Sequence, residues 1–343
     1  MMRGAPAVLA GLLCASAPGC ARDTPAPAGP AARLVSESRL SMGSMLVLTA
    51  WTSDEPAAQT AFDNVFAEFT RLERLMSTWI PESDVSRINR EAGVRPVDVS
   101  LDVREVLKTA RQISEWTGGK FDVTFGALSG LWRFDHDQDN VIPDLREVRR
   151  RVGLIDYRAI QMDEASGTVF LPRKGMSIHL GGIGKGYAID RGAAILRGRG
   201  ERNFMIQSGG DMYVAGHKDG RPWGLAIQDP RGAPNTPFAQ LALSDGTFST
   251  SGDYERYFLK DGRRYHHILD PATGEPSRGT RSVTIVSNLA VFADGLSTGV
   301  FVMGPEAGMN LIERLPDVEG VIVSDTGEVR ISSGLKGKVQ LLN

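Results

Sequence analysis

The sequence has little cysteine, a net charge close to zero and few long apolar runs. Its only two cysteines, Cys14 and Cys20, both lie within the first twenty residues. The rest of the chain therefore has no thiol for a disulfide or a thiolate metal site. The formal net charge is −2 and basic residues are not clustered, which argues against a nucleic-acid partner. No internal repeat is visible, and the 343 residues allow one large domain or two medium ones.

The first twenty residues have the pattern of an export signal. Arg3 precedes an apolar run, Ala5 to Ala17, which is too short to span a bilayer as a mature helix. The run ends in a small residue followed by Cys20, which resembles a bacterial lipoprotein cleavage site. Ordinary cleavage after Ala17 is the alternative, although Pro18 would then follow the cut.

The expected organisation follows from that signal. We predict a signal peptide over 1–19, a Pro- and Ala-rich tether over 20–35 and one domain over 36–343. The predicted location is the periplasm, with a lipid anchor to the inner membrane through Cys20.

A glycine-rich stretch stands at a change of periodicity. Gly182, Gly184 and Gly186 separate a short apolar strand pattern from a helical one, so bare backbone can approach an anion at a helix N-terminus. The stretch is not a P-loop, because His179 and Gly186 replace the required Gly and Ser or Thr, and its G-x-G-x-G spacing is not that of a Rossmann turn. A tight turn with no ligand is the alternative.

Elsewhere the periodicity favours α+β, a compact fold with a largely antiparallel sheet flanked by helices. Helical spacing is expected over Ala57 to Met76, Asp102 to Trp116, Leu145 to Val152 and Asn288 to Met303. Strands are expected at Leu40–Trp51, Tyr157–Met162, Thr168–Leu171, Gly175–Leu180, Asn203–Gln207, Met212–Gly216, Trp223–Gln228, Phe238–Leu243, Thr247–Ser251, Glu255–Lys260 and Arg264–Leu269.

Two clusters in the last third have catalytic chemistry. Asp294 and Thr298 are four residues apart on the expected helix and share one face. Their oxygens suit a hard cation, and Mg²⁺ is best served by few protein oxygens plus substrate phosphate. The alternative is that Asp294 pairs with an Arg and Thr298 bonds to its own helix. His266 and His267 lie at a strand end and should face opposite sides.

Eight segments, in order, resemble the ApbE family of FAD:protein FMN transferases. They are Met42–Ser44, Met76–Asn89, Gly118–Thr124, Leu180–Ala188, Ser208–Gly210, Thr250–Tyr254, His267–Gly274 and Ala293–Thr298. The resemblance implies a T-fold-related α+β fold that binds FAD and transfers FMN to a threonine hydroxyl of an exported protein, releasing AMP. Acceptors of this kind include subunits of membrane redox complexes and other flavin carriers.

The same resemblance assigns individual residues. FAD contacts fall on Met42, Trp79, Lys120, Phe121, Asp122, His179, Lys185 and Ile268. Mg²⁺ ligands fall on Asp294, Thr298 and the carbonyl of Gly182, and His267 falls where a base is proposed. The sequence departs from the family at Trp79, commonly Tyr, at His179, often Asp, and at Ser297, Asp in some members.

Alternatives remain at this stage. Strand phase leaves His266 as a second candidate base. Trp79, in its loop, can be a lid over the core instead of a surface that stacks on a flat ligand. The same site could let water attack, giving an FAD pyrophosphatase, or the chain could be a non-catalytic flavin-binding lipoprotein.

Overall fold

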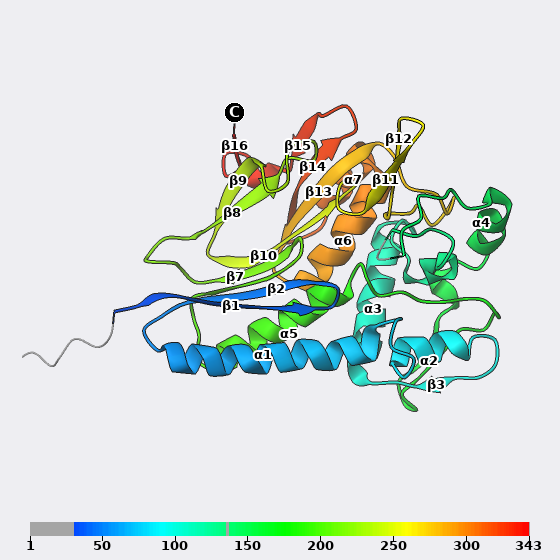
Figure 1. Ribbon diagram of the computed structural model, residues 1–343, viewed down its shortest axis with the longest axis horizontal. Helices are drawn as coiled ribbons and strands as arrows, with labels where there is room; N and C mark the ends of the chain where they lie inside the picture. The colour runs from blue at the N-terminus through cyan, green and yellow to red at the C-terminus, as the bar shows by residue number, and fades with distance from the viewer. Residues whose placement is uncertain (1–30, 135–136, 343) are drawn as a thin grey trace, which may run out of the picture. The chain divides into compact units, whose positions relative to one another are not determined.

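The computed structural model describes residues 31–134 and 137–342, and its centre is an eight-stranded antiparallel sheet (Figure 1). The strand order is β1-β2-β6-β7-β10-β13-β14-β15. The strands are β1 (Arg33–Ser41), β2 (Ser44–Thr52), β6 (Phe204–Ser208), β7 (Asp211–Ala215), β10 (Asp245–Gly252), β13 (Thr280–Ser287), β14 (Val318–Ser324) and β15 (Val329–Ile331). The predicted α+β class with a largely antiparallel sheet is confirmed. The signal peptide and Cys20 lie outside the described residues, and β1 begins inside the stretch 20–35 that was expected to be a tether.

The two faces of this sheet are covered differently. Helices α1 (Glu55–Met76), α5 (Gly184–Gly198), α6 (Ala290–Met303) and α3 (Leu101–Trp116) share the larger apolar core with one face. Alternate residues of the same strands, such as Val214 and Phe248, instead meet a small sheet of β8 (Trp223–Gln228), β9 (Pro237–Leu243) and β16 (Gln340–Leu341). The helix-covered face is the one that carries the site.

The remaining elements are short. They are α2 (Asp84–Arg90), β3 (Val97–Asp98), η1 (Val123–Leu128), α4 (Leu145–Val152), η2 (Tyr157–Ala159), β4 (Gln161–Asp163), β5 (Thr168–Phe170), β11 (Tyr257–Lys260), β12 (Arg263–His266), α7 (Pro305–Ile312) and η3 (Ser333–Leu335). In the part of the chain that is described, no helix combines the length and apolar character needed to cross a membrane.

The single strand expected over Leu40–Trp51 is wrong, because the chain reverses inside it. Met42 and Gly43 both have positive φ, 49° and 74°, and form a two-residue turn between β1 and β2. A methionine in that conformation gives no sequence signal, because turns of this type normally use Asn, Asp or Gly. The turn brings Met42 to the glycine stretch.

Two further expected strands are also corrected. The Gly175–Leu180 segment is extended but joins no ladder, because the Asn89 side chain bonds both the N–H (2.7 Å) and the C=O (2.9 Å) of Ile178. Tyr157–Met162 divides into the 3₁₀ turn η2 and the short strand β4. Apolar alternation was present in both segments, but the hydrogen-bonding partners are side chains or local turns.

Candidate active site

The glycine turn packs directly on α6. A Cβ placed on Gly186 would lie 2.3 Å from the Ala290 carbonyl oxygen, so only glycine permits this approach of α5 to α6. The Gly186 N–H donates to Asp294 Oδ2 at 2.9 Å. Because α5 has no side chain capping its own N-terminus, Asp294 takes one of the free first-turn amides.

This contact gives a prediction for stability. Gly186→Ala should lower the free energy of unfolding by about 3 kcal/mol, because the added methyl group meets backbone that cannot rotate away. Urea denaturation measures it. Gly198→Ala is the matched control in the same helix, since no atom lies within 4 Å of its Cβ position, and it should be neutral or slightly stabilising. Equal effects of the two substitutions would contradict the close approach.

A second contact fixes α5 against α6. Asp190 of α5 accepts from the N–H groups of Ala290 at 2.8 Å and Val291 at 2.9 Å, capping a helix that has no cap of its own. Burial raises the pKa of Asp190 to about 6, against the effect of those two bonds. The register between the two helices that places Asp294 beside Gly186 is therefore held at both ends of one helical turn.

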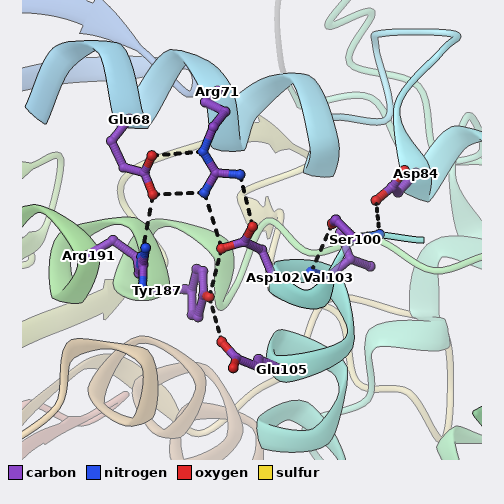
Figure 2. Close-up of polar contacts among 9 residues, drawn as sticks. All are labelled: Glu68, Arg71, Asp84, Ser100, Asp102, Val103, Glu105, Tyr187 and Arg191. Atoms are coloured by element: carbon purple, nitrogen blue, oxygen red, sulfur yellow. Dashed lines mark hydrogen bonds and ion pairs between the residues drawn. The ribbon is translucent and has the colours of Figure 1, made fainter. Parts of the chain in front are cut away.

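The start of α5 is also tied to α1 and α3, as Figure 2 shows. The Tyr187 hydroxyl lies 2.9 Å from Asp102 Oδ1 and 2.7 Å from Glu105 Oε2. Arg71 of α1 bonds Asp102 at 2.9 Å and pairs with Glu68 in its own helix. Burial and the two carboxylates raise the pKa of Tyr187 well above its usual range, so it stays protonated. The network holds the residue that follows the last glycine of the turn.

The predicted metal ligands come together. A Cβ on Gly182 would lie 3.4 Å from Thr298 Oγ1, and Asp294 is one turn before Thr298 on α6. Asp294 is 5% exposed, and the described residues give its carboxylate one hydrogen bond and no direct ion pair. Burial, reinforced by the nearby Asp211 charge, raises its pKa to about 8. A cation bound beside a carboxyl group buried in this way would stabilise its ionised form.

The donor set suits a hard cation such as Mg²⁺. Within residues 31–134 and 137–342 no three His, Cys, Asp or Glu side chains gather at ligand spacing. One carboxylate, one hydroxyl and one carbonyl are few, hard ligands, which fits an ion that takes its other oxygens from phosphate and water. Ser297, by contrast, donates to the Asp294 carbonyl at 2.8 Å and lies 2.8 Å from Ser251 Oγ, so it is engaged within the helix and sheet.

Lys185 pairs with a carboxylate that the sequence analysis did not single out. Its ammonium contacts Asp211 Oδ2, and Ser249 donates to the other oxygen of Asp211. Burial alone would lower the pKa of Lys185, but the charges of Asp211 and Asp294 outweigh it and raise the pKa. The Ser208–Gly210 segment resembles a family motif, but the role of the following Asp211 depends on its register with Ser249.

The two histidines differ as strand alternation predicts. His266 is buried, its Nε2 bonds the Ser277 carbonyl at 2.9 Å, and its Nδ1 accepts from the Ile268 N–H at 3.3 Å. Both ring nitrogens of His266 are thus engaged. His267 is half-buried, and its Nδ1 lies 3.4 Å from the Arg256 carbonyl. Burial, the Arg256 charge and His266 lower the pKa of His267 to about 3, so its ring is neutral.

Three predicted FAD contacts surround the glycine turn. The methyl carbon of Met42 lies 3.8 Å from the Cβ position of Gly184, and Phe121 lies 3.6 Å from that of Gly182. His179 lies beside η1, because its N–H donates to the Val123 carbonyl. Its Nδ1 accepts from the Gly181 N–H at 3.1 Å.

The other predicted contacts have varied surroundings. Lys120 pairs with Asp270 at 2.9 Å, while Asp122 caps η1 and also accepts from the Tyr157 N–H, so its oxygens bond within the fold. Ile268 is buried and bonds Ser277 through its carbonyl. Trp79 follows α1 and is 65% exposed, so it is not a lid buried in the core.

This geometry defines an α+β protein in which a glycine turn lies beside a buried carboxylate, a combination that suits a phosphate-bearing ligand and a hard cation. The match to known proteins is more particular: the model of the ApbE family matches residues 42–322, and the chain belongs to that family.

The similar proteins agree with this assignment. A protein of Klebsiella pneumoniae named FAD:protein FMN transferase is 32% identical over 302 residues, covering 88% of this chain and 92% of its own. The crystal structure of the ApbE protein from Thermotoga maritima superposes with a TM-score of 0.82 at 32% identity, covering 89% of this chain and 99% of that one. The flavin transferase ApbE from Vibrio cholerae superposes with a TM-score of 0.79 at 29% identity, covering 90% of this chain and 99% of that one.

Proposed function

We propose that this chain transfers FMN from FAD to a threonine hydroxyl of an exported protein, in a Mg²⁺-dependent reaction that releases AMP. The observation that carries the proposal is the meeting of Gly182, Asp294 and Thr298 at the glycine turn. The chain belongs to the ApbE family, and similar proteins are named FAD:protein FMN transferase.

In this proposal separate groups of residues bind the metal, the phosphates and the flavin. Asp294, Thr298 and the Gly182 carbonyl would hold Mg²⁺, which supplies charge neutralisation at the pyrophosphate. Lys185 and the bare backbone of the glycine turn bind the phosphates. The flavin nucleotide is bound by Met42, Trp79, Lys120, Phe121, His179 and Ile268, while Asp122 holds the adjoining backbone through its bonds to Thr124 and Tyr157.

His267 acts as the base. As the threonine oxygen bonds to the phosphorus of the FMN half, the bond from that phosphorus to the AMP oxygen breaks, and the threonine proton passes to His267. A neutral imidazole with one ring nitrogen near a backbone carbonyl leaves the other to take that proton. Both nitrogens of His266 already have partners, which supports His267 as the base.

The decisive experiment uses the purified domain, FAD, Mg²⁺ and a flavin-free exported subunit of a membrane redox complex. Mass spectrometry should find one FMN added to a threonine of that subunit, with an equal amount of AMP. Free FMN and AMP without an adduct would support the FAD pyrophosphatase instead, and intact bound FAD alone would support a flavin-binding protein.

We also propose that the protein is exported to the periplasm and anchored to the inner membrane by lipid on Cys20. The apolar run and the cysteine at its end support this. Labelled palmitate should enter the full-length chain and be lost in Cys20→Ala. Label that persists in that variant, or never enters, would refute the anchor.

A further inference from the structure

Three ionisable side chains lie at the start of α5: Lys185, Asp211 in contact with its ammonium, and Asp294 bonded to the N–H of the next residue, Gly186. Asp211 is 3% exposed, and both of its oxygens are bonded, one to the Lys185 ammonium and the other to Ser249. A buried carboxylate held in this way on a strand is a fixed anchor for the ammonium.

Lys185 reaches Asp211 along bare backbone. The Cβ position of Gly209, which has φ +61°, lies 3.6 Å from the Lys185 ammonium nitrogen, so the ammonium is in contact with the turn between β6 and β7. A lysine has a flexible four-carbon stem and three N–H donors, and one donor on Asp211 leaves two for other oxygens. The position of the charge is set by its anchor more than by its own helix.

The neighbouring carboxylate is Asp294. Its backbone partner, Gly186, directly follows Lys185, and the Lys185 charge acts on it electrostatically. The described contacts nevertheless put the ammonium on Asp211, and Asp294 makes no direct ion pair among them. If Asp211 had no charge, Asp294 would be the remaining buried carboxylate near the ammonium.

We propose that Asp211 is a positioning residue that holds the Lys185 ammonium away from Asp294, so that Asp294 stays available to Mg²⁺ and the ammonium stays available to phosphate. This rests on the proposed function and adds to it a residue that touches neither metal nor nucleotide. Asp211 and the Lys185 ammonium neutralise each other, which leaves Asp294 as the carboxylate that can bind an added cation.

The test is a double-mutant cycle with Mg²⁺ as the probe and FAD saturating. The readout is the Mg²⁺ concentration giving half of the maximal rise in Tm. Asp211→Asn should raise that concentration about tenfold, because the freed ammonium pairs with Asp294. Adding Lys185→Gln to that variant should return it to within about threefold of the wild type. Asp245→Asn, an exposed carboxylate paired with Arg197, is the control and should change nothing.

Each outcome decides the matter. An unchanged Mg²⁺ requirement in Asp211→Asn, or a double variant as weak as that single one, would overturn the positioning role. Ser249→Ala keeps the charges of Asp211 and Lys185 but removes one hydrogen bond to Asp211. The Mg²⁺ concentration for half of the maximal rise in Tm should increase about threefold in this variant, which replaces Asp211→Asn as the test if that variant does not fold. A wild type whose Tm ignores FAD and Mg²⁺ would overturn the proposed function as well, whereas normal flavinylation with an unaffected Asp211→Asn overturns this inference alone.

Discussion

Asp294→Asn is expected to lower the rate of FMN transfer by at least about 10³-fold, because several kcal/mol of charge stabilisation at the pyrophosphate depend on the metal it holds. The fold should survive. The asparagine side-chain oxygen can still accept from the Gly186 N–H. The variant also no longer buries a carboxyl group whose pKa the protein raises to about 8. Single-turnover transfer and urea denaturation of the metal-free protein measure the two effects.

The raised pKa of Asp294 also fixes the sign of a pH effect. The metal requires the carboxylate, so protons compete with Mg²⁺ below about pH 8. The Mg²⁺ affinity of the wild type should therefore fall about tenfold per pH unit as pH drops from 8 to 6, and level off above 8. Asp63→Asn, an exposed surface carboxylate, is the matched control and should keep the wild-type rate and pH profile. Substantial transfer by Asp294→Asn at saturating Mg²⁺ would contradict the metal assignment.

The sequence was informative where one element carries the chemistry. Asp294 and Thr298 share a helix, so their spacing alone predicts a common face, and the glycine turn marks its own change of periodicity. Asp211 could not be assigned a role, because its partners Lys185 and Ser249 meet it only through the pairing of β7 with β10 and the packing of α5. Contacts between distant segments leave no local periodicity to detect.

The errors in the predicted strands have a similar physical origin. Alternation reports which residues are buried, but it does not report what bonds the backbone. At Ile178 the partner is the Asn89 side chain, and at Met42 the backbone reverses through a conformation that methionine seldom adopts. Both departures lie beside the site, where the fold brings side chains to the glycine turn instead of extending the sheet.

His267→Ala is expected to keep FAD affinity within about threefold of the wild type while lowering the transfer rate about 10²- to 10⁴-fold, the usual contribution of a general base. Fluorescence titration with FAD and single-turnover transfer separate the two. His266→Ala is the informative neighbour: its ring bonds Ser277 and Ile268, so the loss should appear mainly as a lower Tm. Wild-type transfer by the His267 variant, with loss in the His266 variant at a temperature where it is folded, would move the base to His266.

The pH profile tests the same assignment without a mutation. Because the pKa of His267 is lowered to about 3, its ring is already neutral across the physiological range, so at Mg²⁺ concentrations that saturate the protein at every pH, kcat/KM should show no acid limb near 6.5. Bound phosphates add negative charge and stabilise the imidazolium, which should move the acid limb of kcat to higher pH than that of kcat/KM. The same low pKa means that the folded protein resists protonation below pH 6.5 while the unfolded chain accepts it, so this histidine's contribution to stability is present above pH 6.5 and decreases toward pH 3. An acid limb of kcat/KM at 6.5 that persists in His267→Ala would show that another group controls the proton transfer.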